Sequence, residues 1–214
     1  MAFVLSVCGL KGGVGKSLIS STLACGFHRA GRKTLVIDAD EQGTLRTWAE
    51  KGASNDIPPV IAMDARNLVR DIERVGADYE IAVVDTPARL GKEARAAMMR
   101  ADLVLLPVVR GGPGIWTLDE TLEILEEARA SRPELPAYVV HNMVDHTTLS
   151  QSARERLAEL PIKLVGEGLG YRVAFDEAMT LGADVVAYAP DSEAAREAKA
   201  LFRAVEKLVT KGKR

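Results

Sequence analysis

Cysteine is scarce in this chain, and its two positions exclude several kinds of site. Cys8 and Cys25 match no metal-ligand or disulfide spacing, so we expect two reduced thiols in a cytosolic core, with a disulfide between them as the alternative. Because no cysteine follows Cys25, the second half of the chain has no ligands for an iron–sulfur cluster.

Long apolar runs are missing as well. Residues 1–8 are apolar, but they are too short for a signal peptide or a membrane span, and no cationic region precedes them. No other segment approaches the roughly 20 apolar residues of a membrane helix, so we expect a soluble, cytoplasmic protein. Hydrophobic residues make up 47% and charged residues 27% of the 214 residues, which is typical of one globular domain spanning residues 1–214.

Short apolar runs alternate with longer amphipathic segments from end to end. The runs are rich in Val, Ile and Leu, as expected for strands covered on both faces. This alternation predicts an α/β fold with a single doubly wound, mostly parallel sheet and helices on both faces. The expected strands are 3–8, 34–37, 60–63, 81–84, 103–108, 137–141 and 163–165, and the expected helices are 16–30, 43–51, 65–75, 92–100, 115–130, 149–159, 173–181 and 192–209.

A glycine-rich loop, Gly9-Leu10-Lys11-Gly12-Gly13-Val14-Gly15-Lys16-Ser17, joins the first expected strand to the first helix. Glycines let backbone amides wrap around phosphate oxygens, and the helix N-terminus adds its positive dipole end. Lys16 would reach the β- and γ-phosphates, and the Ser17 hydroxyl would bind Mg²⁺. A plain glycine turn does not explain this order of Gly, Lys and Ser. The expected nucleotide contacts are Gly12, Gly13, Val14, Gly15, Lys16, Ser17 and Leu18.

The loop departs from the common phosphate-loop pattern. Leu10 replaces the first glycine, and Lys11 adds a second lysine before Lys16. With the residues K-G-G-V-G-K-S, the loop resembles that of the ParA/MinD family of deviant Walker A ATPases, and the chain is most similar to short ParA-type partition ATPases. The resemblance implies that Lys11 reaches across a dimer interface to the partner's nucleotide, as a catalytic residue beside Lys16. A solvated loop lysine is the alternative for Lys11.

Two acidic residues, Asp38 and Asp40, follow the second expected strand. Spaced two apart, they face the same side of the sheet at the edge where ligands bind in open α/β folds. The segment D-A-D-E-Q is similar to the family's first switch, which implies that Asp40 activates the attacking water and Asp38 contributes to the Mg²⁺ shell. Glu41 replaces the family's usual proline, a departure that bears on switch flexibility. Alternatively, one or both acids cap the helix beginning near Gly43.

Another apolar strand, residues 81–84, runs directly into Asp85-Thr86-Pro87. An acid in this position after a phosphate loop indicates a Walker B carboxylate, with Asp85 holding Mg²⁺ through water. The D-T-P continuation is similar to the family's second switch.

Two strand ends are expected to contact the base. Residues 106–109 resemble the family's P-V strand end, although Arg110–Pro113 depart from the usual Q-P-S. Residues 139–143 resemble the strand end where an asparagine reads adenine, so Asn142 is the candidate, although Met143 stands where many members have arginine. The alternative for Asn142 is an ordinary turn residue.

The last expected helix carries a basic stripe on an otherwise acidic protein. Residues 192–214 have a net charge of +4, while the whole chain has −2. The stripe consists of Arg196, Lys199, Arg203, Lys207 and Lys211. Basic side chains on one face can bind a phosphate backbone without sequence preference, although a solvated face is the alternative. Residues 172–195 also resemble the C-terminal third of short ParA ATPases, which bind DNA as ATP dimers.

These features predict an Mg²⁺-dependent ATPase that forms an ATP-sandwich homodimer, binds DNA non-specifically and partitions plasmid or chromosome DNA. A ParB-like or cargo adaptor protein would stimulate it, and the ATP state would be nucleoid-associated. One alternative cargo is a protein assembly such as a chemoreceptor cluster or carboxysome. A MinD-like membrane regulator is another alternative, but residues 210–214 hold no apolar residue to insert. Lys11 argues against a small-molecule synthetase on the same fold.

Overall fold

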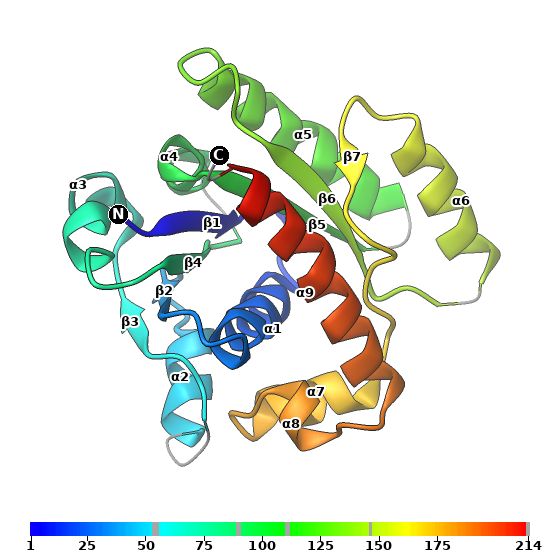
Figure 1. Cartoon of the computed structure of the whole chain (residues 1–214). Coiled ribbons are helices and arrows are strands. Elements are labelled where there is room, and N and C mark those ends of the chain that lie inside the picture. Colours follow the sequence, from blue (N-terminus) through cyan, green and yellow to red (C-terminus); the bar gives the residue numbers. More distant parts are fainter. Residues whose placement is uncertain (53–55, 89–90, 110–111, 146, 213–214) are drawn as a thin grey trace.

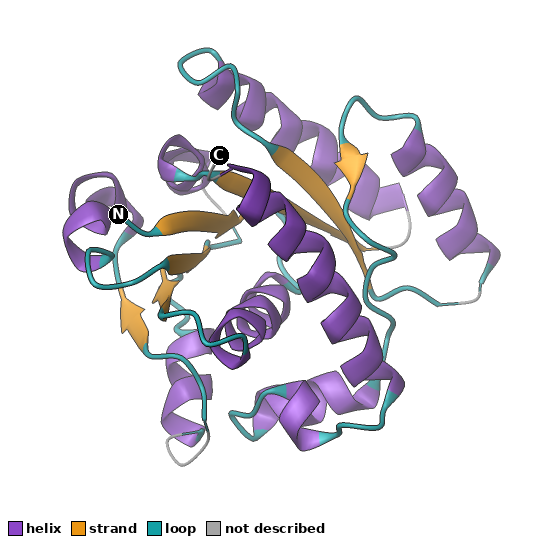
Figure 2. Ribbon diagram, in the orientation of Figure 1, coloured by secondary structure: helices purple, strands orange, loops and turns teal. Residues whose placement is uncertain are grey.

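The computed structural model of the chain describes residues 1–52, 56–88, 91–109, 112–145 and 147–212 (Figures 1 and 2). In these residues, seven strands form one sheet in the order β3-β2-β4-β1-β5-β6-β7, and every pair of neighbours is parallel. The strands are β1 (Phe3–Val7), β2 (Thr34–Asp38), β3 (Val60–Ala62), β4 (Ile81–Asp85), β5 (Leu103–Val109), β6 (Ala137–Asn142) and β7 (Lys163–Leu164). The predicted α/β sheet with helices on both faces is therefore confirmed.

Helices connect the strands and cover the sheet on both sides (Figure 2). They are α1 (Lys16–Arg29), α2 (Thr44–Lys51), α3 (Ala65–Val75), α4 (Gly91–Arg100), α5 (Gly112–Arg129), α6 (Thr148–Ala158), α7 (Val173–Thr180), α8 (Val185–Tyr188) and α9 (Glu193–Gly212). In the part of the chain that the structure describes, no helix combines the length and apolar character needed to span a membrane.

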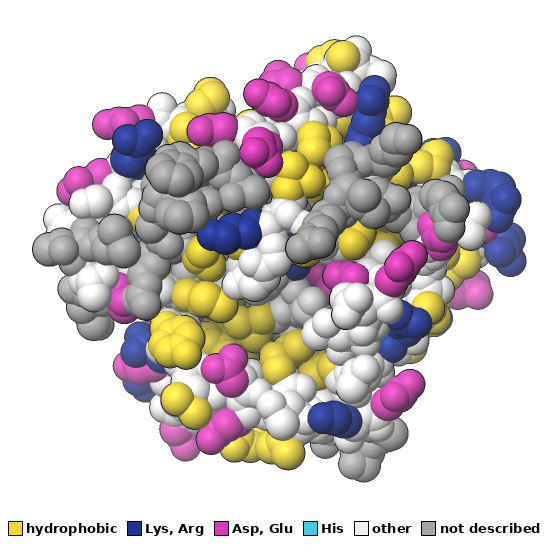
Figure 3. All heavy atoms as spheres, turned by 180° about the vertical axis from the view of Figure 1, so that it is seen from behind, with side chains coloured by type: hydrophobic (Ala, Val, Ile, Leu, Met, Phe, Trp, Pro, Cys, Tyr) yellow, Lys and Arg dark blue, Asp and Glu magenta, His cyan; other side chains and the backbone are white. Residues whose placement is uncertain are grey.

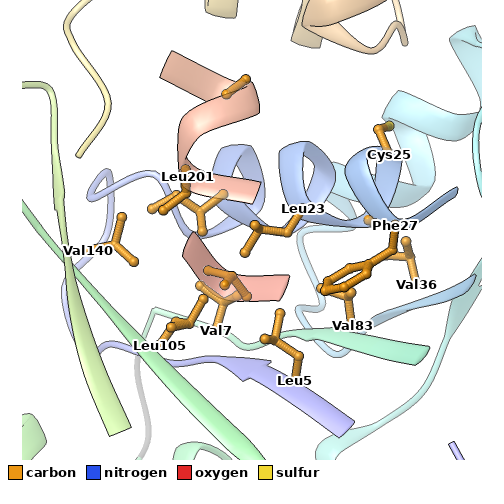
Figure 4. Close-up of a cluster of buried hydrophobic side chains, with 14 of the residues drawn as sticks. Leu5, Val7, Leu23, Cys25, Phe27, Val36, Val83, Leu105, Val140 and Leu201 are labelled. Carbon is orange, nitrogen blue, oxygen red and sulfur yellow. The ribbon is translucent and has the colours of Figure 1, made fainter. Parts of the chain in front are cut away.

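The first core lies between one face of the sheet and the helices α1, α2, α7, α8 and α9. Figure 4 shows how Leu5 and Val7 of β1 lie beneath Leu23 of α1 and Leu201 of α9, all of them buried. Burial of such aliphatic side chains contributes about 1.5–3 kcal/mol each relative to leaving them exposed. This packing fixes α1, and with it the glycine-rich loop that precedes it.

The second core lies on the opposite face, beneath α3, α4, α5 and α6. Alternate residues of the central strand β1 supply it, so that Val4 belongs to this core and Leu5 to the other. Burial on both faces explains why the strands are apolar without interruption. Cys8 lies in this second core and Cys25 in the first, and both are free thiols.

Close packing between α1 and α9 joins the two ends of the chain. Phe202 of α9 meets Phe27 of α1 edge to face, with ring centroids 5.1 Å apart. Gly26 makes this approach possible, because a Cβ at that position would lie 2.5 Å from the Phe202 ring. Helix α9 is therefore seated directly on the helix that follows the glycine-rich loop.

The parallel arrangement gathers the loops that follow the strands at one edge of the sheet. Asp38 at the end of β2 and Val7 at the end of β1 both pair in register with Asp85 at the end of β4. In open α/β sheets this carboxyl edge is where ligands bind.

The Gly26 contact gives a test of the packing between α1 and α9. Gly26→Ala should lower the free energy of unfolding by about 1–3 kcal/mol, because overpacking outweighs the roughly 1 kcal/mol by which alanine favours a helix. Urea unfolding measures the change. Adding Phe202→Leu should recover part of the loss, and a Gly26→Ala variant as stable as the wild type would contradict the contact.

Candidate functional site

The glycine-rich loop leaves the N-terminus of α1 open to an anion. Gly13 and Gly15 have φ of 73° and 86°, a region that L side chains rarely adopt. Gly15 is the N-cap of α1, and the first turn of this helix has neither a side-chain cap nor an acidic residue. The free amides and the helix dipole at this end suit phosphate oxygens. The residues present therefore fit a nucleotide phosphate.

Lys16 is a buried cation at the start of α1. Lys16 is only 7% exposed, and its Nζ donates a hydrogen bond to the Lys11 carbonyl at 3.0 Å. Burial lowers the pKa of Lys16, while the charges of Asp85 and Asp40 oppose this shift. A phosphate group beside Nζ would give the buried charge a strong counter-ion.

Asp85 is a buried carboxyl held by hydroxyl groups of α1. Ser17 Oγ donates to Asp85 Oδ2 at 2.6 Å, and Ser20 Oγ donates to Oδ1 at 3.2 Å. Burial raises the pKa of Asp85 to about 7, with the charge of Asp38 adding to the shift and the Ser17 hydrogen bond opposing it. Mg²⁺ prefers oxygen ligands such as these, so Ser17 and Asp85 fit the predicted metal site. The contact of Ser20 was not predicted, because no sequence pattern distinguishes this serine from the other serines of α1.

Asp38 lies beside Asp85 but has other partners. Its Oδ2 accepts hydrogen bonds from the amides of Leu45 and Arg46 at 3.1 and 3.0 Å, in the first turn of α2. The capping alternative is therefore what the geometry shows for this residue. Its place in the Mg²⁺ shell stays a prediction, and the hydroxyl-bound Asp85 suits a metal better.

Asp40 lies in the turn between β2 and α2 and is half-buried. Its backbone amide donates to Asp38 Oδ1 at 3.1 Å, and its Oδ1 accepts from the Gln42 amide at 3.0 Å. This carboxylate therefore accepts a hydrogen bond within the turn and does not cap the N-terminus of α2. Its charge raises the pKa of Lys16, so the carboxylate lies within electrostatic range of that ammonium group.

Asn142 is the last residue of β6, so it is not a turn residue. Its Nδ2 donates to the Val14 carbonyl at 2.8 Å, and a Cβ at Gly15 would lie 2.0 Å from this nitrogen. Oδ1 is buried without a hydrogen-bond partner among the described residues. Asn142 thus fixes the glycine-rich loop and keeps a free acceptor beside it, which fits a donor group of a bound nucleotide.

Beyond Asn142, an open cavity of about 530 Å³ lies at the ends of β6 and β7. Val144, Gly170 and Tyr171 line it, together with His141, whose Nε2 is buried without a partner in the part of the chain described. Its volume is that of a small-molecule site. Residues 106–109 of the other predicted base segment end β5, and their continuation at 110–111 lies outside the described residues.

Two further predicted residues of the loop and α1 differ in which of their groups could contact a nucleotide. Lys11 is half-buried in the loop, and its carbonyl accepts the Lys16 hydrogen bond. Leu18 packs its side chain against the first core, so only its backbone can meet a phosphate.

The basic stripe of α9 forms a surface apart from the nucleotide site. Lys199, Arg203, Lys207 and Lys211 are exposed along α9, which lies at the front in Figure 1 (red). Arg196 is also exposed and pairs with Glu193. The helix ends with Gly212 beside Phe3, at the start of β1 and away from the carboxyl edge. The cations therefore lie on one exposed helix, as expected from the sequence, and DNA as their ligand stays a prediction.

The chain matches known proteins over most of its length. Residues 5–185 match the family described as CbiA, the CobQ/CobB/MinD/ParA nucleotide binding domain. The chain is 29% identical over 188 residues to maintenance of carboxysome distribution protein A of Halothiobacillus neapolitanus, which covers 86% of this chain and 87% of that protein. It is 30% identical over 209 residues to the protein of the same name from Gloeobacter kilaueensis, covering 94% and 91%.

A solved structure shares the fold. The septum site-determining protein MinD of Pyrococcus horikoshii, complexed with Mg-ADP, aligns with a TM-score of 0.76 and 18% identity over 99% of each chain.

The raised pKa of Asp85 predicts how stability depends on pH when nucleotide and Mg²⁺ are absent. Between the ordinary value of 3.8 and about 7, the folded state holds a proton that the unfolded state releases. The free energy of unfolding should therefore fall by on the order of a few kcal/mol as pH rises through this window, and level off above it.

Asp85→Asn should remove this contribution, so the variant should gain stability relative to the wild type from pH 5 to pH 8. Urea midpoints at both pH values measure the difference. A wild-type–variant difference that does not change with pH would contradict the shift.

Proposed function

The chain belongs to the CobQ/CobB/MinD/ParA nucleotide-binding domain family and is an ATPase that uses ATP and Mg²⁺; from this premise we propose that it dimerises around ATP, binds DNA without sequence preference and positions a cargo. The proposal is carried by the two-lysine loop: Lys16 is buried within the electrostatic influence of Asp85 and Asp40, and Lys11 is half-buried beside exposed Gly12 and Gly13. A dimer that forms only with ATP needs both lysines: Lys16 would bind the phosphates of its own subunit's nucleotide, and Lys11 would contact the nucleotide of the partner subunit.

The chemistry of hydrolysis follows from the positions of the charges. The amides of the loop and Lys16 would bind the β- and γ-phosphates, and Ser17 and Asp85 would hold the cation. When bound, Mg²⁺ neutralises charge that develops on the phosphate oxygens. Asp40, in the turn between β2 and α2, orients the attacking water and accepts its proton. Asn142 keeps the loop in shape during this step.

Dimerisation is supported by the surface around the site. Gly12 and Gly13 are exposed at the carboxyl edge beside Lys11. Tyr171 and Val173 follow the segment that pairs with Val144 beyond β6, and they are 62% and 67% exposed. In the proposed dimer these two exposed side chains would be covered by the second copy. A second copy facing this edge would bring its Lys11 toward the nucleotide.

DNA binding is supported by the stripe on α9. Four exposed cations at a four-residue spacing can contact successive phosphates along a backbone. On the opposite face of the molecule, Lys and Arg side chains are scattered among acidic ones (Figure 3). Two stripes in a dimer would double the phosphate contacts, so affinity for DNA would follow the nucleotide state.

The names of two relatives give information about the cargo. Two relatives at 29% and 30% identity are named for maintaining carboxysome distribution. This favours a protein assembly as cargo over the plasmid or chromosome that the sequence placed first. An adaptor protein on that assembly would stimulate ATP hydrolysis. In both cases the ATPase and DNA steps are the same, so the tests below do not depend on the cargo.

Two variants separate hydrolysis from dimerisation. Asp40→Ala should bind ATP and form a lasting dimer, because it removes the group that activates water, with turnover falling at least about 100-fold. Lys11→Ala should bind ATP yet stay monomeric, because it removes the charge offered to the partner's nucleotide. Light scattering with ATP and a phosphate-release assay measure both properties.

Wild-type turnover by Asp40→Ala would remove the assignment of Asp40. An ATP-dependent dimer of Lys11→Ala would make Lys11 an ordinary loop lysine.

Charge reversal on α9 tests the DNA surface. Arg203→Glu with Lys207→Glu should abolish ATP-dependent DNA binding while ATP-dependent dimerisation survives, because both side chains point away from the core. For the wild-type dimer the log of the binding constant should fall with the log of salt, with a slope of roughly 0.9 per neutralised phosphate. A surface-binding assay across a salt series measures both quantities.

The matched control is Arg156→Glu with Lys163→Glu, which changes the net charge equally at exposed positions of α6 and β7. This variant should keep most of the binding. If the α9 variant bound DNA like the wild type, the stripe would be a solvated face.

A further inference from the structure

The turn that carries Asp40 lacks the residue that would make it rigid. The Gly43 amide donates to the Asp40 carbonyl at 3.0 Å, which closes a β-turn over residues 40–43. Asp at the first position and Gly at the fourth suit such a turn, but its second position favours proline, which presets φ. Here that position holds Glu41, an exposed residue. The backbone between β2 and α2 is therefore not restrained by a proline at this position.

Arg46, in the first turn of α2, supplies contacts across this turn. Its Nη2 donates to the carbonyls of Asp40 and Glu41, each at 3.2 Å. Its Nε lies 3.6 Å from Asp38 Oδ2, and this nitrogen is buried without a hydrogen-bond partner among the described residues. One guanidinium thus links the end of β2, the turn and the start of α2.

Gly43 makes room for the guanidinium. It has φ of 65°, and a Cβ there would lie 2.6 Å from Arg46 Nη2. The planar fork of arginine can reach two carbonyls and a carboxylate together, which the single ammonium group of lysine cannot do in the same geometry.

We propose that Arg46 is a positioning residue for hydrolysis: it fixes the turn, and through the turn it fixes the carboxylate of Asp40 toward the attacking water. This inference rests on the proposed role of Asp40. The Asp40 backbone is held at both ends, its amide by Asp38 and its carbonyl by Arg46. Without Arg46 the carbonyl side is held by the turn hydrogen bond alone. A displacement of about 1 Å at a catalytic group can cost on the order of 100-fold in rate.

The test compares turnover with nucleotide affinity. Arg46→Ala should lower kcat at least about tenfold while the Kd for ADP stays within about threefold, because no part of Arg46 belongs to the phosphate loop. Arg46→Lys should recover only a small part of the loss. The control Lys51→Ala changes an exposed cation at the other end of α2 and should keep the wild-type kcat.

A second change distinguishes positioning from general stability. Adding Glu41→Pro to Arg46→Ala should restore most of kcat, because proline restrains the same turn without touching nucleotide. The hydrogen bonds of the described residues do not use the Glu41 amide, so proline displaces none of them. A merely structural loss would leave kcat low while the melting temperature changed.

The outcomes separate this inference from the proposed function. Wild-type kcat in Arg46→Ala, with Asp40→Ala inactive, would overturn the role of Arg46 and leave the ATPase mechanism intact. Wild-type turnover by Asp40→Ala would overturn the mechanism itself. If Arg46→Ala failed to fold, Arg46→Lys would decide: a lowered kcat with unchanged Kd supports the inference, and a wild-type kcat overturns it.

Discussion

The site depends on one electrostatic constraint: ionisable groups of opposite charge are buried at the carboxyl edge of a parallel sheet. Asp85 is so deeply buried that its pKa rises to about 7, even with two serine hydroxyls bound to it. Lys16 is buried nearby, and its pKa is lowered by the same cause. The opposite charges of Lys16 and Asp85 offset the effect of burial only in part. A bound polyphosphate would add negative charge beside Lys16, and Mg²⁺ would add positive charge beside Asp85, so both ionised forms would be favoured in the bound state.

The buried charged groups are linked to the rest of the molecule because the helices and strands that bear them pack in the core. Lys16 and Ser17 begin α1, whose Gly26 and Phe27 pack on Phe202 of α9. Asn142 at the end of β6 donates a hydrogen bond to the Val14 carbonyl, which ties the glycine-rich loop to the sheet. The helix that carries the basic stripe thus packs directly on the helix that follows the phosphate loop, and in the proposed dimer at the carboxyl edge this packing would set the relative positions of the two stripes.

Most of the fold could be predicted from the sequence, because apolar runs and glycine turns are local signals. All seven strands were expected within two residues of their observed ends. The short helix α8 was not expected, since four residues capped by Asp184 carry no helical period. The order of the strands and the separate cores of Cys8 and Cys25 depend on contacts far apart in the chain, which no local pattern reports.

The site was predictable where chemistry depends on residue type, and not where it depends on geometry. The loop with Lys11 and Lys16 and the acid Asp85 stand out by residue type and position. The role expected of Asp40 came from the family resemblance, and Asp38 could be a cap or a ligand until its contacts with α2 were seen. Arg46 gave no signal, because an arginine in the first turn of a helix is ordinary in a sequence. Its importance follows only from the turn it crosses. Here the contacts across the turn come from a side chain of α2 rather than from a proline within the turn, and such an arrangement is visible only in three dimensions.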